Sequence, residues 1–350
     1  MEYLDPHQRP PDGIRKVYKK YQKMKLQDLD ADPDIVDLSS GMPPNLNSKV
    51  RVVKEVDPSQ LSASFRAFAG GDIPHHNSPV GERVTVYEHD DMPGLHIIPS
   101  FLPPSIQPLL LNRLLHRDLS HPTHLTNIHT HYNINYPRSS PESAPTSFFS
   151  LSPTSPATIA VPIDPSIHRP ITIAQLLNKK MRWMTIGGQY DWTEKRYPDS
   201  APPVFPADIK DLLENTFSDT KAEAAIVNLY SPGDTLSVHR DVAETSATGL
   251  ISVSLGCDAV FVIGTSTSES SDRGPVEKVL ALRLRSGSAV YMSRLSRFAW
   301  HGVPQIVPGT CPGGLKDWPA GNVDGEEGEL YENWRGWMKG KRVNLNVRQM

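Results

Sequence analysis

A short segment near the C-terminus carries two arginines and two asparagines at alternate positions. It runs Arg342-Val343-Asn344-Leu345-Asn346-Val347-Arg348. Side chains alternate between the two faces of a strand, so the polar residues share one face and the apolar residues share the other. The two guanidinium groups would lie about 20 Å apart, too far for one compact anion but suited to an elongated anion between them. From this segment alone, an exposed polar face on an edge strand is an equally good interpretation.

Upstream of this segment, three residues have the types and spacing of metal ligands. His239 and Asp241 are separated by one residue and would share a strand face, and His301 supplies a third candidate. Two histidines and one carboxylate leave open positions on an octahedral metal, as in non-haem iron(II) oxygenases, whereas zinc more often takes three or four protein ligands. Such an iron needs a bidentate cosubstrate. An elongated dicarboxylate such as 2-oxoglutarate would also give both arginines an anion to bind.

Other histidines match parts of this pattern but lack its context. His89 and His116 are each followed two positions later by an aspartate, but His116 falls in a predicted leucine-rich helix, where side chains two residues apart diverge. Neither is expected to bind a metal. Four further histidines lie in a polar segment and are expected to be exposed rather than to form a metal site. These are His121, His124, His129 and His131.

Periodicity predicts the elements that must position these residues. Apolar residues at helical spacing predict helices over 13–26, 104–119, 171–177 and 208–217. The first of these helices would have a basic side that faces solvent. From about residue 223 the period changes to two, which predicts strands over 225–230, 251–255, 259–263, 280–285 and 289–292. Several short strands without intervening helices indicate a double-sheet roll or barrel. The proline- and serine-rich segment 137–170 is expected to be a flexible insertion.

Composition limits the class of protein. The 350 residues, 38% of them hydrophobic, can bury a substantial core, and a formal net charge of −3 leaves any nucleic-acid contact to local basic segments. An apolar run of about eighteen residues and an export or transit signal are both absent, so we expect no membrane segment. Cys257 and Cys311 are too few for a disulfide framework. We expect a monomer in the nucleus or cytoplasm, with a mitochondrial pool left open.

In these segments the chain resembles the AlkB family of Fe(II)/2-oxoglutarate-dependent dioxygenases. The matching stretches are 228–233 leading to 239–241, 251–256, 296–303 and the closing RxNxxxR of 342–348. They occur in the family's order and spacing, and the resemblance covers about residues 189–349. Upstream, the looser similarity of 93–99 and 182–187 is most like the eukaryotic branch typified by AlkB homologue 1.

The resemblance implies a fold and a division of the chain. It implies an α+β protein in which a C-terminal double-stranded β-helix, or jelly-roll, carries N-terminal helices packed on it. We expect a helical or irregular extension over 1–92. Residues 93–222 would form the first part of the AlkB-like domain with its nucleotide-recognition lid, and 223–350 the jelly-roll core.

The resemblance also implies the site residues and the cofactors Fe(II), 2-oxoglutarate and O2. The implied iron ligands are His239, Asp241 and His301. The residues implied to hold 2-oxoglutarate, with Arg342 on its distal carboxylate, are Asn228, Tyr230, Arg342, Asn344 and Arg348. Two positions depart from the family pattern, because Asn346 replaces a threonine or serine and Trp300 replaces a tyrosine or asparagine.

The substrates that the resemblance implies are methylated bases in nucleic acid, held against aromatic side chains. The segment 179–197 interleaves basic and aromatic residues, so its cations could hold phosphates and an aromatic ring could stack on the base at roughly 1–3 kcal/mol. Trp183 and Tyr190 are expected in the core. The residues expected to contact the substrate are Trp192, Arg196 and Tyr197.

These observations together predict an oxidative demethylase of bases such as 1-methyladenine in RNA, in particular tRNA, or in DNA. One alternative keeps the cofactors but changes the target to a protein such as a histone, or to oxidation of 5-methylcytosine. Another is a catalytically silent RNA-binding member of the same fold.

Overall fold

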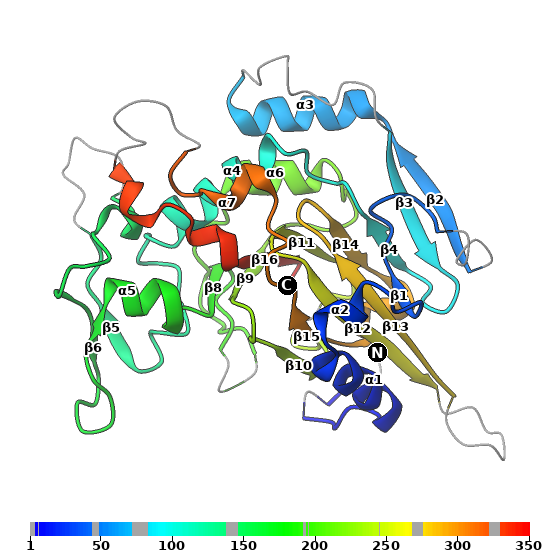
Figure 1. Ribbon diagram of the computed structural model, residues 1–350, viewed down its shortest axis with the longest axis horizontal. Helices are drawn as coiled ribbons and strands as arrows, with labels where there is room; N and C mark the ends of the chain where they lie inside the picture. Colours follow the sequence, from blue (N-terminus) through cyan, green and yellow to red (C-terminus); the bar gives the residue numbers. More distant parts are fainter. Residues whose placement is uncertain are drawn as a thin grey trace.

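Two β-sheets that face each other form the centre of the molecule (Figure 1). The computed structural model describes residues 4–5, 7–43, 49–71, 83–137, 146–191, 194, 196–244, 246–267, 276–321 and 330–350. Within this part of the chain, all strand pairs are antiparallel except β1 with β13. The protein therefore combines helices with antiparallel sheets, as the sequence predicts.

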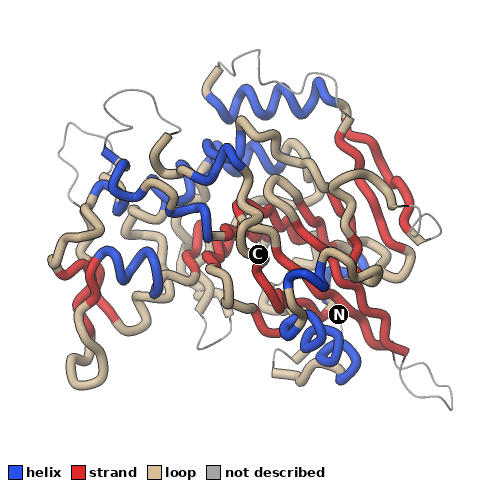
Figure 2. Tube along the Cα trace, in the orientation of Figure 1, coloured by secondary structure: helices blue, strands red, loops and turns tan. Residues whose placement is uncertain are grey.

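The larger described sheet has eight strands in the order β2-β3-β4-β14-β11-β16-β9-β8. Their bounds are β2 Val50–Val56, β3 Val84–His89, β4 Leu95–Ile98, β14 Ala289–Met292, β11 Leu250–Gly256, β16 Arg342–Arg348, β9 Ala224–Tyr230 and β8 Trp183–Gly187. The smaller sheet has five strands, β1 Ile35–Val36, β13 Val276–Leu284, β12 Ala259–Thr267, β15 Trp300–Ile306 and β10 Leu236–His239. A third sheet lies to one side (Figure 2) and contains β5 Tyr132–Ile134, β6 Thr158–Pro162 and β7 Ile171–Thr172.

Helices cover the outer faces and one end of the sheets. The α-helices are α1 Asp12–Lys23, α2 Leu26–Leu29, α3 Pro58–Ala69, α4 Ile106–Leu111, α5 Ile173–Gln175, α6 Ala207–Glu214 and α7 Gly313–Lys316. Two π-helical segments, Asn112–Asp118 and Leu176–Lys180, continue α4 and α5. None of these described helices is both long and apolar enough to cross a membrane.

The basic helix predicted at the N-terminus is α1, and it packs on the outer face of the smaller sheet. Its apolar side buries Ile14 and Tyr21 against Val260 and Val262 of β12. The intervening Phe261 points to the opposite face, as the period of a strand requires. This packing confirms the amphipathic helix and leaves the inner face of the sheet free to form the site.

The C-terminal strand predicted over 342–348 is β16, with the same bounds. It lies between β11 and β9, so the alternative of an edge strand is wrong. Asn344 pairs with Ser254 of β11 and with Asn228 of β9. Gly256, at the end of β11, has a φ of +86°, and a Cβ there would lie 2.3 Å from the carbonyl oxygen of Lys341. Glycine therefore allows the close approach that begins this strand pair.

The first 92 residues are not only helical or irregular, which corrects the expectation for this part of the chain. They supply β1 to the smaller sheet and the antiparallel pair of β2 and β3 to the larger one. The sequence signal is weak because the central residues of β2, 51–55, are all exposed. A strand without a buried face lacks the alternation of apolar and polar residues that identifies strands.

The described part of the segment 137–170 is folded, which corrects the expectation of a flexible insertion; residues 138–145 lie outside the described part. β6 pairs with β5 and β7, and Phe148 and Phe149 are buried. The Phe149 ring lies 4.9 Å from the Trp318 ring and 5.1 Å from the Trp337 ring in edge-to-face geometry. Two aromatic anchors are enough to fix a segment whose average composition is polar.

We expect Phe149→Ala to lower the free energy of unfolding by about 3–5 kcal/mol, because it leaves a cavity among buried aromatic rings. Urea unfolding followed by tryptophan fluorescence measures this loss. Ile163→Ala is the matched control in the same segment, since Ile163 is 59% exposed, and we expect a change within about 0.5 kcal/mol. Equal stability of the two variants would contradict the packing of this segment.

Candidate metal centre and anion cavity

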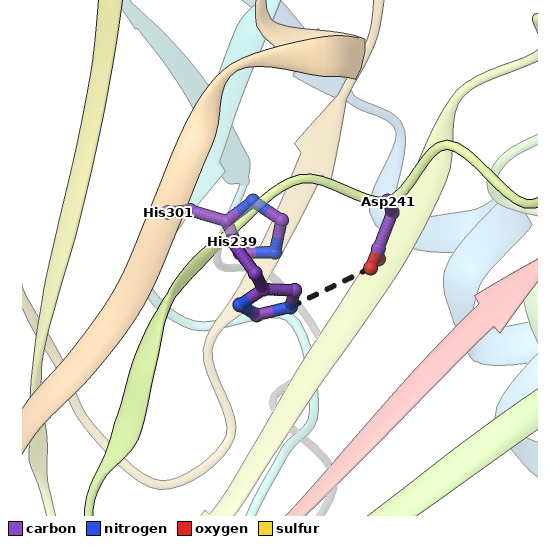
Figure 3. A group of neighbouring side chains, drawn as sticks. All are labelled: His239, Asp241 and His301. Carbon is purple, nitrogen blue, oxygen red and sulfur yellow. Dashed lines mark ion pairs between the residues drawn. The ribbon is translucent and has the colours of Figure 1, made fainter. Parts of the chain in front are cut away.

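Strand register brings the three predicted metal ligands together. β10 pairs with β15, and His239 lies directly opposite His301 in that pair. Asp241 follows two residues later, in the loop that leaves β10. One ligand atom from each residue lies within 4.8 Å of the other two, and Figure 3 shows the two imidazoles beside the carboxylate. Of the described residues, no other group of three histidine, cysteine or acidic side chains is placed to hold a metal.

Both histidines are oriented by backbone carbonyl groups. The Nδ1 atom of His239 lies 2.9 Å from the carbonyl oxygen of Ser237, and Nδ1 of His301 lies 3.0 Å from that of Ala299. Because a carbonyl oxygen only accepts hydrogen bonds, each Nδ1 carries a proton and each Nε2 keeps its lone pair. Histidine ligands in metalloproteins are commonly fixed in this way.

The charges around the three ligands favour an ionised Asp241 carboxylate and a neutral His301, and they act on His239 in the opposite direction. Burial opposes ionisation of Asp241, but the Arg348 charge and the His239 ring hold its pKa well below the usual range. Burial and the His239 charge lower the pKa of His301 to about 4. Burial lowers the pKa of His239, but the hydrogen bond and charge of Asp241 outweigh this effect and raise it. This donor set of two imidazoles and one carboxylate matches the coordination preference of iron(II).

The ligands open onto a cavity of about 300 Å³ between the two sheets. The larger sheet contributes polar residues of β9 and β16, and the smaller sheet contributes apolar residues. The polar side is lined by Asn228, Arg342, Asn344, Asn346 and Arg348, and the apolar side by Leu236, Phe261, Leu284 and Val303. The polar face predicted for the C-terminal strand is therefore the wall of this cavity.

Arg342 is buried at one end of the cavity and lacks an acidic partner among the described residues. Its Nη1 donates to the carbonyl oxygens of Cys257 and Leu284, and its Nη2 donates to Ser254 Oγ at 2.7 Å. Nε is buried without a hydrogen-bond partner. Burial lowers the pKa of this guanidinium to about 10. A buried cation without an anion is costly, so the site fits a carboxylate supplied from outside the chain.

Arg348 lies at the other end of β16 and already has acidic partners. Its Nη2 lies 3.3 Å from Asp241 Oδ2, and its Nη1 donates to Glu244 Oε1 at 2.9 Å. Its Nε is buried without a partner. Burial opposes ionisation, but the Asp241 charge outweighs it and the pKa of Arg348 is raised. The two arginines therefore differ, because Arg348 is paired with a candidate metal ligand whereas Arg342 forms no ion pair with any described carboxylate.

The other residues predicted to bind the anion differ in whether their polar groups already have a hydrogen-bond partner. Tyr230 pairs with Arg342 in register, and its hydroxyl is buried without a hydrogen-bond partner. Asn228 lines the cavity. The Asn344 amide donates to Ser252 Oγ and to the carbonyl oxygen of Val253, so it also braces β11. Asn346 donates to Asn344 Oδ1 at 3.1 Å, so the residue that departs from the family pattern keeps a polar link along the strand.

The residues predicted to contact a substrate differ in their exposure to solvent. Trp192 lies outside the described residues. Arg196 is exposed, and its nearest acidic group is Asp199 Oδ2 at 3.7 Å. Tyr197 is half-buried, and its hydroxyl donates to Glu244 Oε1 at 3.5 Å. Tyr190 is half-buried and lines the cavity, which corrects its expected place in the core.

His124 and Glu244 both lie in places that the sequence did not predict. His124 is buried, with Nδ1 2.9 Å from the carbonyl oxygen of Asp118, so the prediction of an exposed side chain is wrong for this residue. Glu244 was not predicted to belong to the site, yet its side chain is 1% exposed and bonds to Arg348. Its place three residues after Asp241 is the only signal in the sequence.

Comparison with known proteins identifies the family. The family model described as "2OG-Fe(II) oxygenase superfamily" matches residues 94–348. "N6-methyladenosine RNA demethylase ALKB1" of Pyricularia oryzae is 43% identical over 360 residues, which cover 99% of this chain and 98% of that protein. "N6-methyladenosine RNA demethylase ALKBH" of Cryphonectria parasitica is 50% identical over 64% of this chain and 99% of that protein. "tRNA demethylase abh1" of Schizosaccharomyces pombe is 46% identical over 52% of this chain and 57% of that protein.

The chain belongs to the 2OG-Fe(II) oxygenase superfamily and, within it, to the AlkB family in the branch of AlkB homologue 1. It is therefore a dioxygenase that uses iron(II), 2-oxoglutarate and O2. The described residues fit these cofactors, because two histidines and a carboxylate converge at one place. The unpartnered Arg342 Nε and Tyr230 hydroxyl mark the place for an anion.

We expect His301→Ala to weaken binding of Mn²⁺, an air-stable substitute for iron(II), by more than about 100-fold, since loss of a residue that merely supports a ligand costs 10–100-fold. Titration of the metal-free protein by calorimetry measures this change. His124→Ala removes a buried histidine outside the site and should bind Mn²⁺ like the wild type. Unchanged binding by His301→Ala would exclude this triad as the metal centre.

Proposed function

We propose that this protein removes methyl groups oxidatively from adenine bases in RNA. The observation that carries the proposal is a single cavity that joins a two-histidine, one-carboxylate cluster to a buried arginine that forms no ion pair with a described residue. The names of the relatives that match the chain support the choice of substrate, since two of them are called N6-methyladenosine RNA demethylases and one a tRNA demethylase.

In this proposal the iron ligands are His239, Asp241 and His301. Arg342 and Tyr230 bind the distal carboxylate of 2-oxoglutarate, with Asn228 and Asn344 along its length. Because Arg348 pairs with Asp241, the metal end of the cavity is the Arg348 end, and Arg342 lies about six residues of strand away. The distance between the two ends requires an elongated cosubstrate.

When bound with O2, iron and 2-oxoglutarate supply the oxidation, which releases succinate and CO2 and lets the oxidised methyl group leave the base as formaldehyde. The chain itself orients the reactants. Arg342 fixes the cosubstrate from its far end, and the carbonyl groups of Ser237 and Ala299 hold both imidazoles with Nε2 towards the metal position. The apolar wall around Phe261 and Val303 limits the access of water.

The two facing sheets would form the double-stranded β-helix expected for this family, with the cavity inside it. We propose that Tyr190, from the end of β8, meets the base at the cavity mouth. Arg196, Tyr197 and Trp192 would belong to the lid that holds the flanking nucleotides. A base must leave its stack to enter such a cavity, and stacking on an aromatic side chain offsets part of that cost.

Release of succinate and formaldehyde on incubation with RNA oligonucleotides that carry N6-methyladenosine or 1-methyladenosine tests the proposal. We expect turnover that depends on the methyl group and on added 2-oxoglutarate, and none with His239→Ala. Unmethylated RNA and the corresponding methylated DNA are the controls. Substrate-independent turnover, or RNA binding without oxygen consumption, would reject the proposed activity.

Arg342→Ala should raise the 2-oxoglutarate concentration needed for half-maximal turnover by about 10–100-fold, the equivalent of one charge-assisted hydrogen bond. Arg342→Lys keeps the charge but loses the planar fork of donors, so its 2-oxoglutarate requirement should lie between those of the wild type and Arg342→Ala. Mn²⁺ affinity should change by less than about threefold in both variants. If metal binding weakens while the 2-oxoglutarate requirement stays the same, Arg342 does not bind the cosubstrate.

A further inference from the structure

A closed ring of four charged residues lies behind the candidate metal ligands. Arg348 Nη1 donates to Glu244 Oε1 at 2.9 Å, and Arg297 Nη2 donates to Glu244 Oε2 at 3.1 Å. Arg297 Nη1 donates to the carbonyl oxygen of Asp241 at 3.0 Å, and Arg348 Nη2 lies 3.3 Å from Asp241 Oδ2. The ring therefore begins and ends on Asp241.

Glu244 is the residue that completes this ring, and it is fully buried. The side chains of Glu244 and Arg297 are each 1% exposed, and that of Arg348 is 6% exposed. Two carboxylates and two guanidinium groups cancel in formal charge, which is a condition for burying them together. Charge-assisted hydrogen bonds of this kind also hold their partners in fixed directions.

The ring joins three parts of the chain that each carry a component of the site. Glu244 lies in the loop of Asp241, and Arg348 ends β16. Arg297 lies in the 3-10 helix Arg294–Phe298, which leads into β15, the strand of His301. Arg297 Nε also donates to the carbonyl oxygen of Thr248 at 2.8 Å, so this arginine clamps both ends of the loop 241–248. The described residues of this loop, 241–244 and 246–248, belong to no helix or strand that would otherwise hold Asp241 in place.

We infer that Glu244 is a positioning residue for the metal centre, an inference that rests on the proposed function. By holding Arg348 at one oxygen and Arg297 at the other, Glu244 keeps Arg348 from closing fully onto Asp241. The Asp241 carboxylate then remains available to a cation. Without the Glu244 charge, Arg348 has Asp241 as its remaining acidic partner, and the local charge rises by one unit in the place where a divalent cation must bind.

The test is Mn²⁺ binding to the metal-free protein by calorimetry, with Glu244→Gln as the main variant. This change keeps the size of the side chain and removes its charge, and we expect the Mn²⁺ dissociation constant to rise by about 10–100-fold. Glu244→Asp retains the charge and should bind Mn²⁺ with an affinity between those of the wild type and Glu244→Gln. The 2-oxoglutarate requirement at saturating metal should change by less than about threefold.

Asp118→Asn is the matched control for the loss of a buried ion pair. The Asp118 side chain is 3% exposed and accepts from Arg117 Nε at 2.6 Å, away from the candidate site. A merely structural role for Glu244 predicts that both variants melt at lower temperature and bind Mn²⁺ equally well. Wild-type affinity in Glu244→Gln would overturn the inference, whereas a wild type that binds no Mn²⁺ would instead reject the proposed metal centre.

Should Glu244→Gln fail to fold, Arg297→Lys tests the same ring. Lysine keeps the charge but cannot bond at once to Glu244, Asp241 and Thr248 through a planar fork. We expect its Mn²⁺ dissociation constant to rise at least about threefold, and an unchanged value would overturn the inference.

Discussion

The burial of two guanidinium groups on one central strand is the constraint on which the site depends. β16 lies between β9 and β11 in the middle of the larger sheet, and the side chains of Arg342 and Arg348 on its inner face are both buried. Removing an arginine from water costs several kcal/mol unless an anion compensates it. At Arg348 two carboxylates, those of Asp241 and Glu244, compensate this cost. At Arg342 the described residues supply neutral hydrogen-bond acceptors but no ion pair, and Nε has no partner.

This asymmetry gives the cavity a direction. The end at Arg348, where protein carboxylates pair with the arginine, holds the candidate metal ligands. The end at Arg342, where no such pair forms among the described residues, can accept a carboxylate from a bound molecule. A binding site that is short of one negative charge discriminates strongly against neutral molecules, because its buried polar groups stay unpaired in their presence. The sheets supply the rigidity that such discrimination needs, since both arginines and both histidines lie on strands that pair with a neighbouring strand.

The sequence predicts those parts of the site that short-range geometry determines. The period of a strand was enough to place the polar residues from Arg342 to Arg348 on one face. It grouped His239 with Asp241 for a reason that the structure corrects, because β10 ends at His239 and Asp241 lies in the loop that follows. It could not predict the contacts of Glu244, whose partners Arg297 and Arg348 are 53 and 104 residues away. Composition was misleading over 146–170, because many prolines and serines conceal the few aromatic residues that pack.

The directly opposed positions of His239 and His301 have a consequence for folding. Side chains alternate along a strand, so a slip of one residue between β10 and β15 would turn one imidazole to the far side of the sheet. A chain paired in that way could not gain the free energy of metal binding, which stabilises only the conformation that binds. Binding of the cation would thus add to the free energy difference between the native strand alignment and an alignment shifted by one residue.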